Sequence, residues 1–321
     1  MFQTILRFIK NRKYHRCHLG QHILIIDPNF DIGIQEYYKY VTSLFMRAIE
    51  RLPPYPKKIT FILGITNYQI ERKIPYKQIG FQVEHTLVKP GGRGSENAPL
   101  GNTLITSTLD QFYCVRIQNL SHLLEQDIII EYSRPNIKHI KDSGLYQDYL
   151  NKVCQISPTL YHLDKEKVSN QARSLNTVTL FRDINEPRRK KFLEGLRRHQ
   201  VPFENINHVF QNLDQVYLNT KILVNIRQTD HHDTLEELRI LPALQCGVIV
   251  ISEDAPLKKY SRYSDFIIWG TIQELPNLIK NVLANYETYH QTIFSSAFYN
   301  RINRLELSNS KALDKLLALH T

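Results

Sequence analysis

The sequence predicts an α/β protein built from two Rossmann-like domains that face each other across a cleft. Short apolar runs typical of buried parallel strands alternate with longer segments whose apolar residues recur at helical spacing. This alternation begins near residue 22 and again near residue 177, and the polar stretch around residues 162–175 separates the two series. We therefore expect an N-terminal domain over residues 1–170 and a C-terminal domain over residues 171–290. Residues 291–321 form a helical segment that can pack back on the first domain.

Six segments of the first half read as strands: residues 22–28, 57–65, 80–88, 102–107, 127–133 and 153–158. The helical spacing of residues 34–52 and 113–125 predicts two helices, and residues 133–144 read as a loop with a short helix. Residues 89–101 are rich in Gly and Pro and predict a loop.

The second half repeats the pattern. Its predicted strands are residues 177–184, 221–226, 247–252 and 265–270, and its predicted helices are residues 186–200, 235–246 and 273–290. Thr234 and Glu237 have the spacing of a capping box at the start of the helix over residues 235–246. A strand–helix–strand unit of this length predicts a right-handed parallel crossover.

Composition and charge bound the possible partners. The chain is 42% hydrophobic, no apolar run reaches the roughly 18 residues of a membrane span, and the first twenty residues are too polar for a secretory signal. The four cysteines are scattered, so we expect reduced thiols in a cytoplasmic protein. The net charge of +10 favours polyanions such as nucleic acid, phosphorylated substrates or an anionic membrane surface.

The basic residues gather in three clusters: the first sixteen residues, residues 188–191 and residues 197–198. Each cluster can equally be a solvated helix face. In the first, apolar and basic side chains alternate in a way that suits either a helix lying on the inner face of a membrane or a docked terminal helix.

Polar side chains gather where the predicted strands of the second half end. Asn225, Arg227 and His231 follow one strand, and Glu253 follows the next. Ligands of open parallel sheets bind beyond the carboxyl ends of the strands, so this edge is the expected ligand site.

These segments resemble a known family. Residues 221–226 (KILVNI), the Glu-x-x-Arg-Ile element at residues 236–240 and residues 247–253 (GVIVISE) resemble the C-terminal domain of B-type glycosyltransferases (GT-B fold). Residues 180–198 resemble the first strand and helix of that domain. Residues 127–140 (DIIIEYSRPNIKHI) resemble the end of the first domain in some bacterial and viral sugar transferases. The resemblance covers residues 127–285 and extends to the first 126 residues in topology alone.

The resemblance implies transfer of a sugar from a nucleotide-sugar donor to a glycan or glycolipid acceptor, such as a lipopolysaccharide or other surface-glycan precursor. Without a metal, the negative charge that grows on the departing diphosphate must meet cations or helix amides. The candidates are Arg182, Arg188, Lys221 and Arg227, although Lys221 stands at the opposite end of its strand. The resemblance further implies that Glu236 and Glu253 accept hydrogen bonds from ribose or sugar hydroxyls, with His231 nearby.

The same residues can also have purely structural roles. Glu236 and Arg239 have the spacing of an ion pair on one helix, and Glu253 can be a loop-capping acid. Two acids seven residues apart mark the retaining enzymes of the family, whereas Glu236 and Glu237 here are adjacent. Whether transfer inverts or retains the anomeric configuration therefore stays open.

An inverting reaction needs a general base, which we expect from the N-terminal domain. Glu84 and His85 are the best candidates and Asp31 is the next, although each can be an ordinary loop or strand residue. We expect no metal, because the adjacent histidines 231 and 232 lack a third ligand and the chain has no Asp-x-Asp triplet. A basic nucleic-acid-binding protein without catalysis, or another sugar-nucleotide enzyme such as an epimerase or phosphorylase, remains as an alternative.

Overall fold

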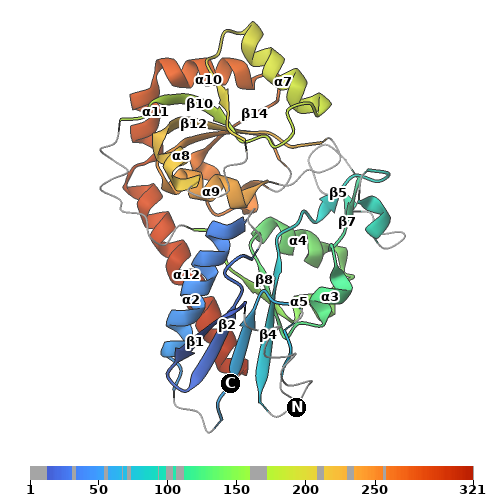
Figure 1. The fold of residues 1–321 in the computed structure, drawn as a ribbon. Coiled ribbons are helices and arrows are strands. Elements are labelled where there is room, and N and C mark those ends of the chain that lie inside the picture. Colours follow the sequence, from blue (N-terminus) through green and yellow to red (C-terminus); the bar gives the residue numbers. More distant parts are fainter. Residues whose placement is uncertain are drawn as a thin grey trace.

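The chain folds into a mixed α/β structure with parallel sheets, as the sequence predicts (Figure 1). A computed structural model provides the coordinates. The structure describes the following residues: 13–30, 34–53, 57–66, 68–70, 74–92, 94–98, 104–105, 112–159, 172–207, 213–229, 235–255 and 258–320.

The first sheet has six strands in the order β1-β2-β3-β4-β8-β9, and all neighbours are parallel except β1 and β2. Its strands are β1 (His15–Leu19), β2 (His22–Ile26), β3 (Thr60–Leu63), β4 (Tyr76–Gln82), β8 (Ile128–Glu131) and β9 (Val153–Gln155). The helices of this half are α2 (Gln35–Glu50), α3 (Leu120–Leu124), α4 (Arg134–Ser143) and α5 (Gln147–Leu150). The buried face of α2 carries aromatic and aliphatic side chains, which pack on the sheet to form the core of the first half.

The second sheet has five parallel strands in the order β11-β10-β12-β13-β14. They are β10 (Leu175–Thr179), β11 (Glu204–Asn205), β12 (Thr220–Asn225), β13 (Ile249–Glu253) and β14 (Ile267–Gly270). The helices are α7 (Pro187–Arg198), α8 (Leu213–Asn219), α9 (Glu237–Gln245), α10 (Leu275–Ala284) and α11 (Tyr286–Ile293), with short turns η3 (Lys258–Tyr260) and η4 (Ser264–Phe266). β12 and β13 are buried along nearly their whole length, which explains their continuous apolar runs.

A small antiparallel sheet stands beside the first sheet. It has the order β5-β7-β6, formed by β5 (Leu87–Val88), β6 (Leu104–Ile105) and β7 (Phe112–Val115), with the short helix η2 (Ser95–Asn97) after β5. The secondary structure predicted from the sequence is wrong at two places in this region. Residues 80–88 divide between β4 and β5, and the helix expected over residues 113–125 is instead β7 followed by α3. The β-rich residues FYCV pair with strands on both sides, and this pairing outweighs the local helical spacing.

The long helix α12 (Ser296–His320) joins the two halves. Near its start, Phe298, Ile302 and Leu305 belong to the core of the second half, whereas Leu313 and Leu317 belong to the core of the first. Between them, the buried Asn309 accepts a hydrogen bond from the Ser157 amide at 3.0 Å and donates to the Tyr40 hydroxyl at 2.9 Å. Figure 1 shows this helix running from the upper half down beside α2. The C-terminal segment thus packs on the core of the first half.

Other expectations need adjustment. Residues 1–12, which carry most of the expected N-terminal helix, lie outside the described residues. Residues 15–19, which follow, form β1 at the edge of the first sheet, and residues 134–143 form a full helix. The expected domain boundary near residue 170 lies outside the described residues, between β9 and β10. Among the described residues, no helix combines the length and apolar character that crossing a membrane requires.

Candidate active site

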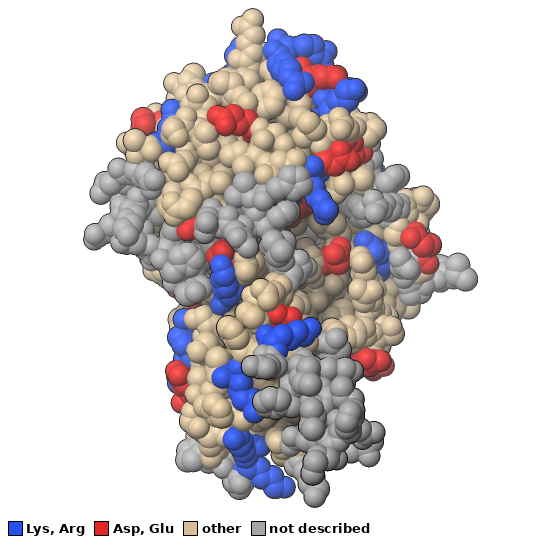
Figure 2. All heavy atoms as spheres, in the orientation of Figure 1, with Lys and Arg blue, Asp and Glu red and all other residues tan. Residues whose placement is uncertain are grey.

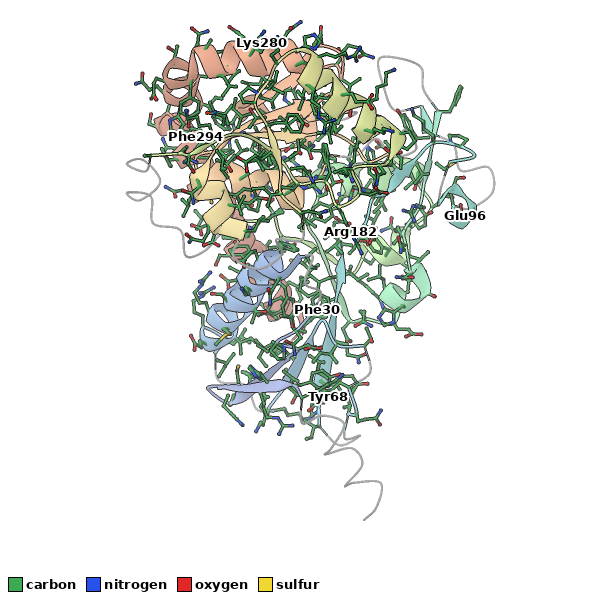
Figure 3. All side chains as sticks on the ribbon, turned by 45° about the horizontal axis from the view of Figure 1, so that its top comes forward. Phe30, Tyr68, Glu96, Arg182, Lys280 and Phe294 are labelled. Carbon is green, nitrogen blue, oxygen red and sulfur yellow. The ribbon has the colours of Figure 1, made fainter. Side chains whose placement is uncertain are left out.

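A cavity of about 1220 Å³ lies between the two sheets, and we call it the central cavity. Its walls come from loops that follow strands of both halves: Glu84 and His85 after β4, Arg116 after β7, Arg182 after β10, and Arg227 after β12. Figure 3 shows Arg182 between the two halves, with Glu96 farther out on the small sheet's side. The carboxyl edges of the two sheets therefore border one cavity, which is where parallel sheets bind ligands.

The loop that carries Glu84 and His85 is held by the buried Asn136 of α4. The Asn136 amide donates to the Glu84 carbonyl oxygen at 3.3 Å, and its Oδ1 accepts a hydrogen bond from the Thr86 hydroxyl at 3.0 Å. Asn136 is only 1% exposed, so these bonds are made out of water, where they hold the loop most firmly. Two of the predicted catalytic residues thus stand on a fixed loop beside the cavity.

Arg116 is a wall residue that the sequence analysis missed. It is 6% exposed, yet its guanidinium reaches the cavity wall and donates to the Gln118 side chain at 3.3 Å. Gly94, with a φ of +91°, lets the chain pass close by, because a Cβ there would meet the Arg116 guanidinium at 2.9 Å. Arg116 directly follows β7, and a position after a strand would have marked it as a candidate. The sequence pattern predicts a helix over residues 113–125, so it places no strand end before Arg116.

On the opposite side, Arg227 is fixed by Glu253 at the end of β13. The Arg227 guanidinium donates to Glu253 Oε1 at 2.6 Å, and its backbone N–H donates to Oε2 at 3.2 Å. Arg188, from the first turn of α7, also donates both terminal nitrogens to the same carboxylate, one of them at 2.7 Å. One carboxylate therefore aligns two arginines from different elements.

Burial alone would raise the pKa of the Glu253 carboxyl, but hydrogen bonds from Arg188 and Arg227 outweigh it and hold that pKa below its ordinary value. Glu253 is 6% exposed and stands behind the cavity rather than on its wall. Glu253 and Arg188 are therefore absent from the wall of the central cavity, and their direct contact with a ligand stays a prediction. Both oxygens of Glu253 are occupied by arginines, and the two residues position Arg227.

A polar contact crosses the cavity. His85 Nε2, from the first half, lies 3.9 Å from Glu236 Oε1, and Glu236 Oε2 lies 2.9 Å from Arg239 on α9. Arg239 also donates to the side chain of the buried Asn225 at 3.4 Å. The predicted ion pair of Glu236 and Arg239 is thus present, and the structure adds a histidine across the cavity. Asn225 and Arg239 support Glu236 from behind.

The next residue, Glu237, points the other way. Its carboxyl is fully buried among the hydroxyl groups of Ser133, Ser261 and Tyr263, and burial raises its pKa to about 8. The capping box expected for Thr234 and Glu237 is corrected, because α9 begins at Glu237 and this side chain is engaged with the first half. Thr234 lies outside the described residues.

The remaining predicted residues do not reach the cavity or cannot be placed. The Lys221 ammonium lies 5.5 Å from the Tyr286 ring, at the far end of β12, as its position in the strand suggested. Asp31 and His231 lie outside the described residues. In the described part of the chain, no three His, Cys, Asp or Glu side chains are grouped to hold a metal ion.

The charges of the central cavity are mixed. Arg116, Arg182 and Arg227 face it together with four carboxylates, those of Glu84, Glu96, Asp183 and Glu236. Arginines bind phosphate oxygens, and carboxylates accept hydrogen bonds from hydroxyl groups. The lining therefore suits a ligand that carries both phosphate and hydroxyl groups better than it suits a polyanion.

Comparison with known proteins gives a weak sequence match and distant structural matches. No protein-family model matches the chain. An uncharacterized protein of Acanthamoeba polyphaga mimivirus is 26% identical over 202 residues, covering 61% of this chain and 68% of that protein.

Among solved structures, the fold is similar to a chain of the GtfA/B complex, with a TM-score of 0.44, 13% identity and 88% of this chain covered. It is also similar to a chain of a Glycosylation Associate Protein complex from Streptococcus agalactiae, with a TM-score of 0.41, 12% identity and 91% covered. In both cases the chain spans 59% of the length of the solved one.

Proposed function

We propose that this protein is a glycosyltransferase of the B-type arrangement that takes a nucleotide-sugar donor. The observation that carries the proposal is the central cavity, where arginines of the second half stand opposite Glu84 and His85 of the first. The second half would hold the donor and the first half the acceptor. The volume of the central cavity, about 1220 Å³, is large enough for donor and acceptor, since ligand sites commonly measure about 300–1,000 Å³.

The donor diphosphate would lie against Arg182 and Arg227. As the bond between the anomeric carbon and the diphosphate breaks, negative charge grows on the leaving phosphate oxygen, and these guanidinium groups meet it without a metal. Arg227 enters this role already oriented by Glu253, so little rearrangement is needed when the charge develops. Glu236, on the same side, would accept hydrogen bonds from a hydroxyl of the donor.

His85 is the proposed general base, and Glu236 its orienting partner. Neutral His85 takes the proton of the acceptor hydroxyl, whose oxygen attacks the anomeric carbon while the diphosphate departs with the bonding electron pair. Glu236, 3.9 Å from His85 Nε2, stabilises the imidazolium that forms. Glu84 lies on the same loop and is the alternative base for an inverting reaction.

The acceptor we propose is a glycan or glycolipid, such as a surface-glycan precursor at the cytoplasmic face of a membrane. The basic residues of α7 support this, because they gather at one corner of the face shown in Figure 2, where Figure 1 places that helix. A basic surface concentrates molecules that carry phosphate or anionic lipid.

A thermal-shift screen with uridine, guanosine and cytidine nucleotides and their sugars, in the presence of EDTA, tests the proposal. At least one nucleoside diphosphate should raise the melting temperature of the wild type. Arg182→Gln should lose the shift, while Lys221→Gln, which removes a cation far from the cavity, should keep it. Stabilisation by oligonucleotides alone, disappearing with added salt, would instead favour nucleic-acid binding.

A further inference from the structure

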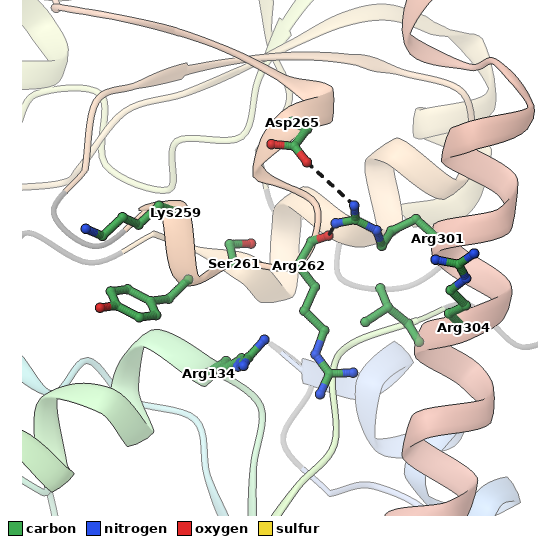
Figure 4. A pocket seen from close by; sticks show the side chains of 9 residues that line it. Arg134, Lys259, Ser261, Arg262, Asp265, Arg301 and Arg304 are labelled. Atoms are coloured by element: carbon green, nitrogen blue, oxygen red, sulfur yellow. Dashed lines mark hydrogen bonds and ion pairs between the residues drawn. The ribbon is translucent and has the colours of Figure 1, made fainter.

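A second cavity lies on another side of the boundary between the halves, and we call it the basic cavity. It has a volume of about 290 Å³, and three elements contribute to it: the start of α4, the η3–η4 region and α12 (Figure 4). Its charged lining residues are Arg134, Lys259, Arg262, Arg301, Arg304 and Asp265. Five cations therefore surround this space with a single carboxylate, in contrast to the mixed lining of the central cavity.

The cations of the basic cavity are poorly compensated. Within the described part of the chain, Asp265 pairs with Arg301 at 3.6 Å, and no carboxylate pairs with Arg134, Arg262 or Arg304. Burial lowers the pKa of Arg262, and the neighbouring positive charge of Arg134 lowers it further. Because two guanidinium groups across a cavity repel each other, binding of an anion between them is electrostatically favourable.

The arginines are also held in place. Arg262 donates to the Ser308 hydroxyl of α12 at 2.8 Å, and Arg301 donates to the Arg262 carbonyl oxygen. The Nε atom of Arg262 is buried without a hydrogen-bond partner among the described residues. Figure 4 shows Arg134 and Arg262 approaching each other from the two halves, with Arg304 on α12 at the side. The site is thus built from both halves, and Arg262 and Arg301 are oriented before any ligand enters.

We propose that the basic cavity binds a phosphate group and that this anion links α4 of the first half to the η3–η4 region and α12. Arginine suits this ligand because its planar guanidinium donates two parallel hydrogen bonds to phosphate oxygens. The volume accommodates a phosphate monoester with a small part of the molecule that carries it. Binding here is separate from donor binding and does not depend on the proposed glycosyl transfer.

The basic cavity nevertheless shares a wall with the central one. Ser261 lines the basic cavity and, with Ser133 and Tyr263, surrounds the buried Glu237. Glu236, the preceding residue, lines the central cavity. An anion that ties Arg134 to Arg262 would therefore stabilise the relative position of the two halves next to the candidate active site.

Titration of inorganic phosphate into the full-length protein, by calorimetry at constant ionic strength, tests the proposal. Arg134→Gln and Arg304→Gln remove exposed side chains at the cavity, and each should weaken phosphate binding about tenfold or more, because each removes a charge-assisted hydrogen bond. Arg47→Gln is a matched control, since it removes an equally exposed arginine that lines neither cavity, and it should bind like the wild type.

Arg182→Gln, in the central cavity, should still bind phosphate at the basic cavity. A failure of the phosphate proposal can therefore be told apart from a failure of the proposed function. Circular dichroism of each variant verifies the fold. Equal affinity in all variants, or no phosphate binding by the wild type, would overturn the proposal. Co-sedimentation with vesicles containing phosphatidic acid, against phosphatidylcholine alone, then distinguishes a lipid head group from a free phosphate compound as the source.

Discussion

Two buried glutamates of the second half exist in opposite environments. Glu253, at the end of β13, is bound by the guanidinium groups of Arg188 and Arg227, and its pKa lies below the ordinary value. Glu237, at the start of α9, is surrounded by the hydroxyl groups of Ser133, Ser261 and Tyr263, and burial raises its pKa to about 8. Near neutral pH the first is a carboxylate and the second carries a proton.

The difference in protonation between Glu253 and Glu237 gives two glutamates two different structural roles. The charged Glu253 fixes an arginine that faces the central cavity, whereas the neutral Glu237 serves as a hydrogen-bonding group within the boundary between the halves. Glu131 of the first half repeats the second case. It is fully buried, accepts hydrogen bonds from Asn136 and Tyr149, and has its pKa raised to about 8 by burial. Burial raises the pKa of all three carboxyl groups, and only at Glu253 do arginine partners outweigh it and keep the group charged.

The largest effect on stability should appear when the same substitution, glutamate to glutamine, is made separately at Glu253 and at Glu237. Glu253→Gln leaves two largely buried arginines without their carboxylate, so we expect the free energy of unfolding to fall by about 3–5 kcal/mol. Glu237→Gln replaces a neutral acid with a neutral amide of the same shape and should cost less than about 1 kcal/mol at pH 6. Urea unfolding of both variants measures the two losses, and equal losses would contradict a charged Glu253 beside a neutral Glu237.

The stability of the wild type should decrease as the pH rises from about 6.5 to 8, because at lower pH the buried His139, whose pKa burial lowers to about 4, changes stability in the opposite direction. Between the ordinary carboxyl pKa of the unfolded chain, about 4.3, and the native value of about 8, the folded protein holds protons that the unfolded chain releases. Glu131 and Glu237 should each contribute a loss of about 1 kcal/mol per pH unit in this range. Denaturant unfolding at half-unit pH steps would measure the slope.

Glu237→Gln should flatten that slope. The variant has no proton to lose at this position, so its stability relative to the wild type should improve by about 1 kcal/mol per pH unit between pH 6 and 8. Glu253→Gln should leave the slope in this range unchanged, because Glu253 is ionised in both the folded and unfolded states there. Parallel pH dependence of Glu237→Gln and the wild type would contradict a protonated Glu237.

An effect smaller than that of Glu253→Gln concerns Ser133, which supports Glu237 from the first half. Its hydroxyl also caps α4 by accepting a hydrogen bond from the backbone N–H of Asn136 at 3.3 Å. Ser133→Ala should therefore lower the free energy of unfolding by about 1–2 kcal/mol. Thermal melting at pH 6 measures the loss, and Ser43→Ala on the surface-facing side of α2 serves as the control with little expected change.

Strands and their ends were predictable where burial makes the sequence continuous. β2 and β8 lie within the segments predicted as strands, β12 and β13 differ from theirs by one or two residues at the ends, and the polar residues after β4, β10 and β12 line one cavity. Arg116 was missed because β7 is a short strand whose pairing is set by residues distant in sequence. The roles of Glu253 and Glu237 depend on Arg188, Arg227, Ser133 and Ser261, which tertiary packing alone brings to them. No local pattern records such partners.

The most direct test of the account is release of nucleoside diphosphate from a nucleotide sugar, measured in EDTA with a mixed glycan acceptor. The wild type should turn over at least one donor, and His85→Gln should lower kcat by about 10²–10⁴-fold while keeping donor binding, because the general base is lost. Lys221→Gln should match the wild type. Turnover that survives unchanged in both His85→Gln and Arg182→Gln would contradict the assignment of the central cavity as the active site.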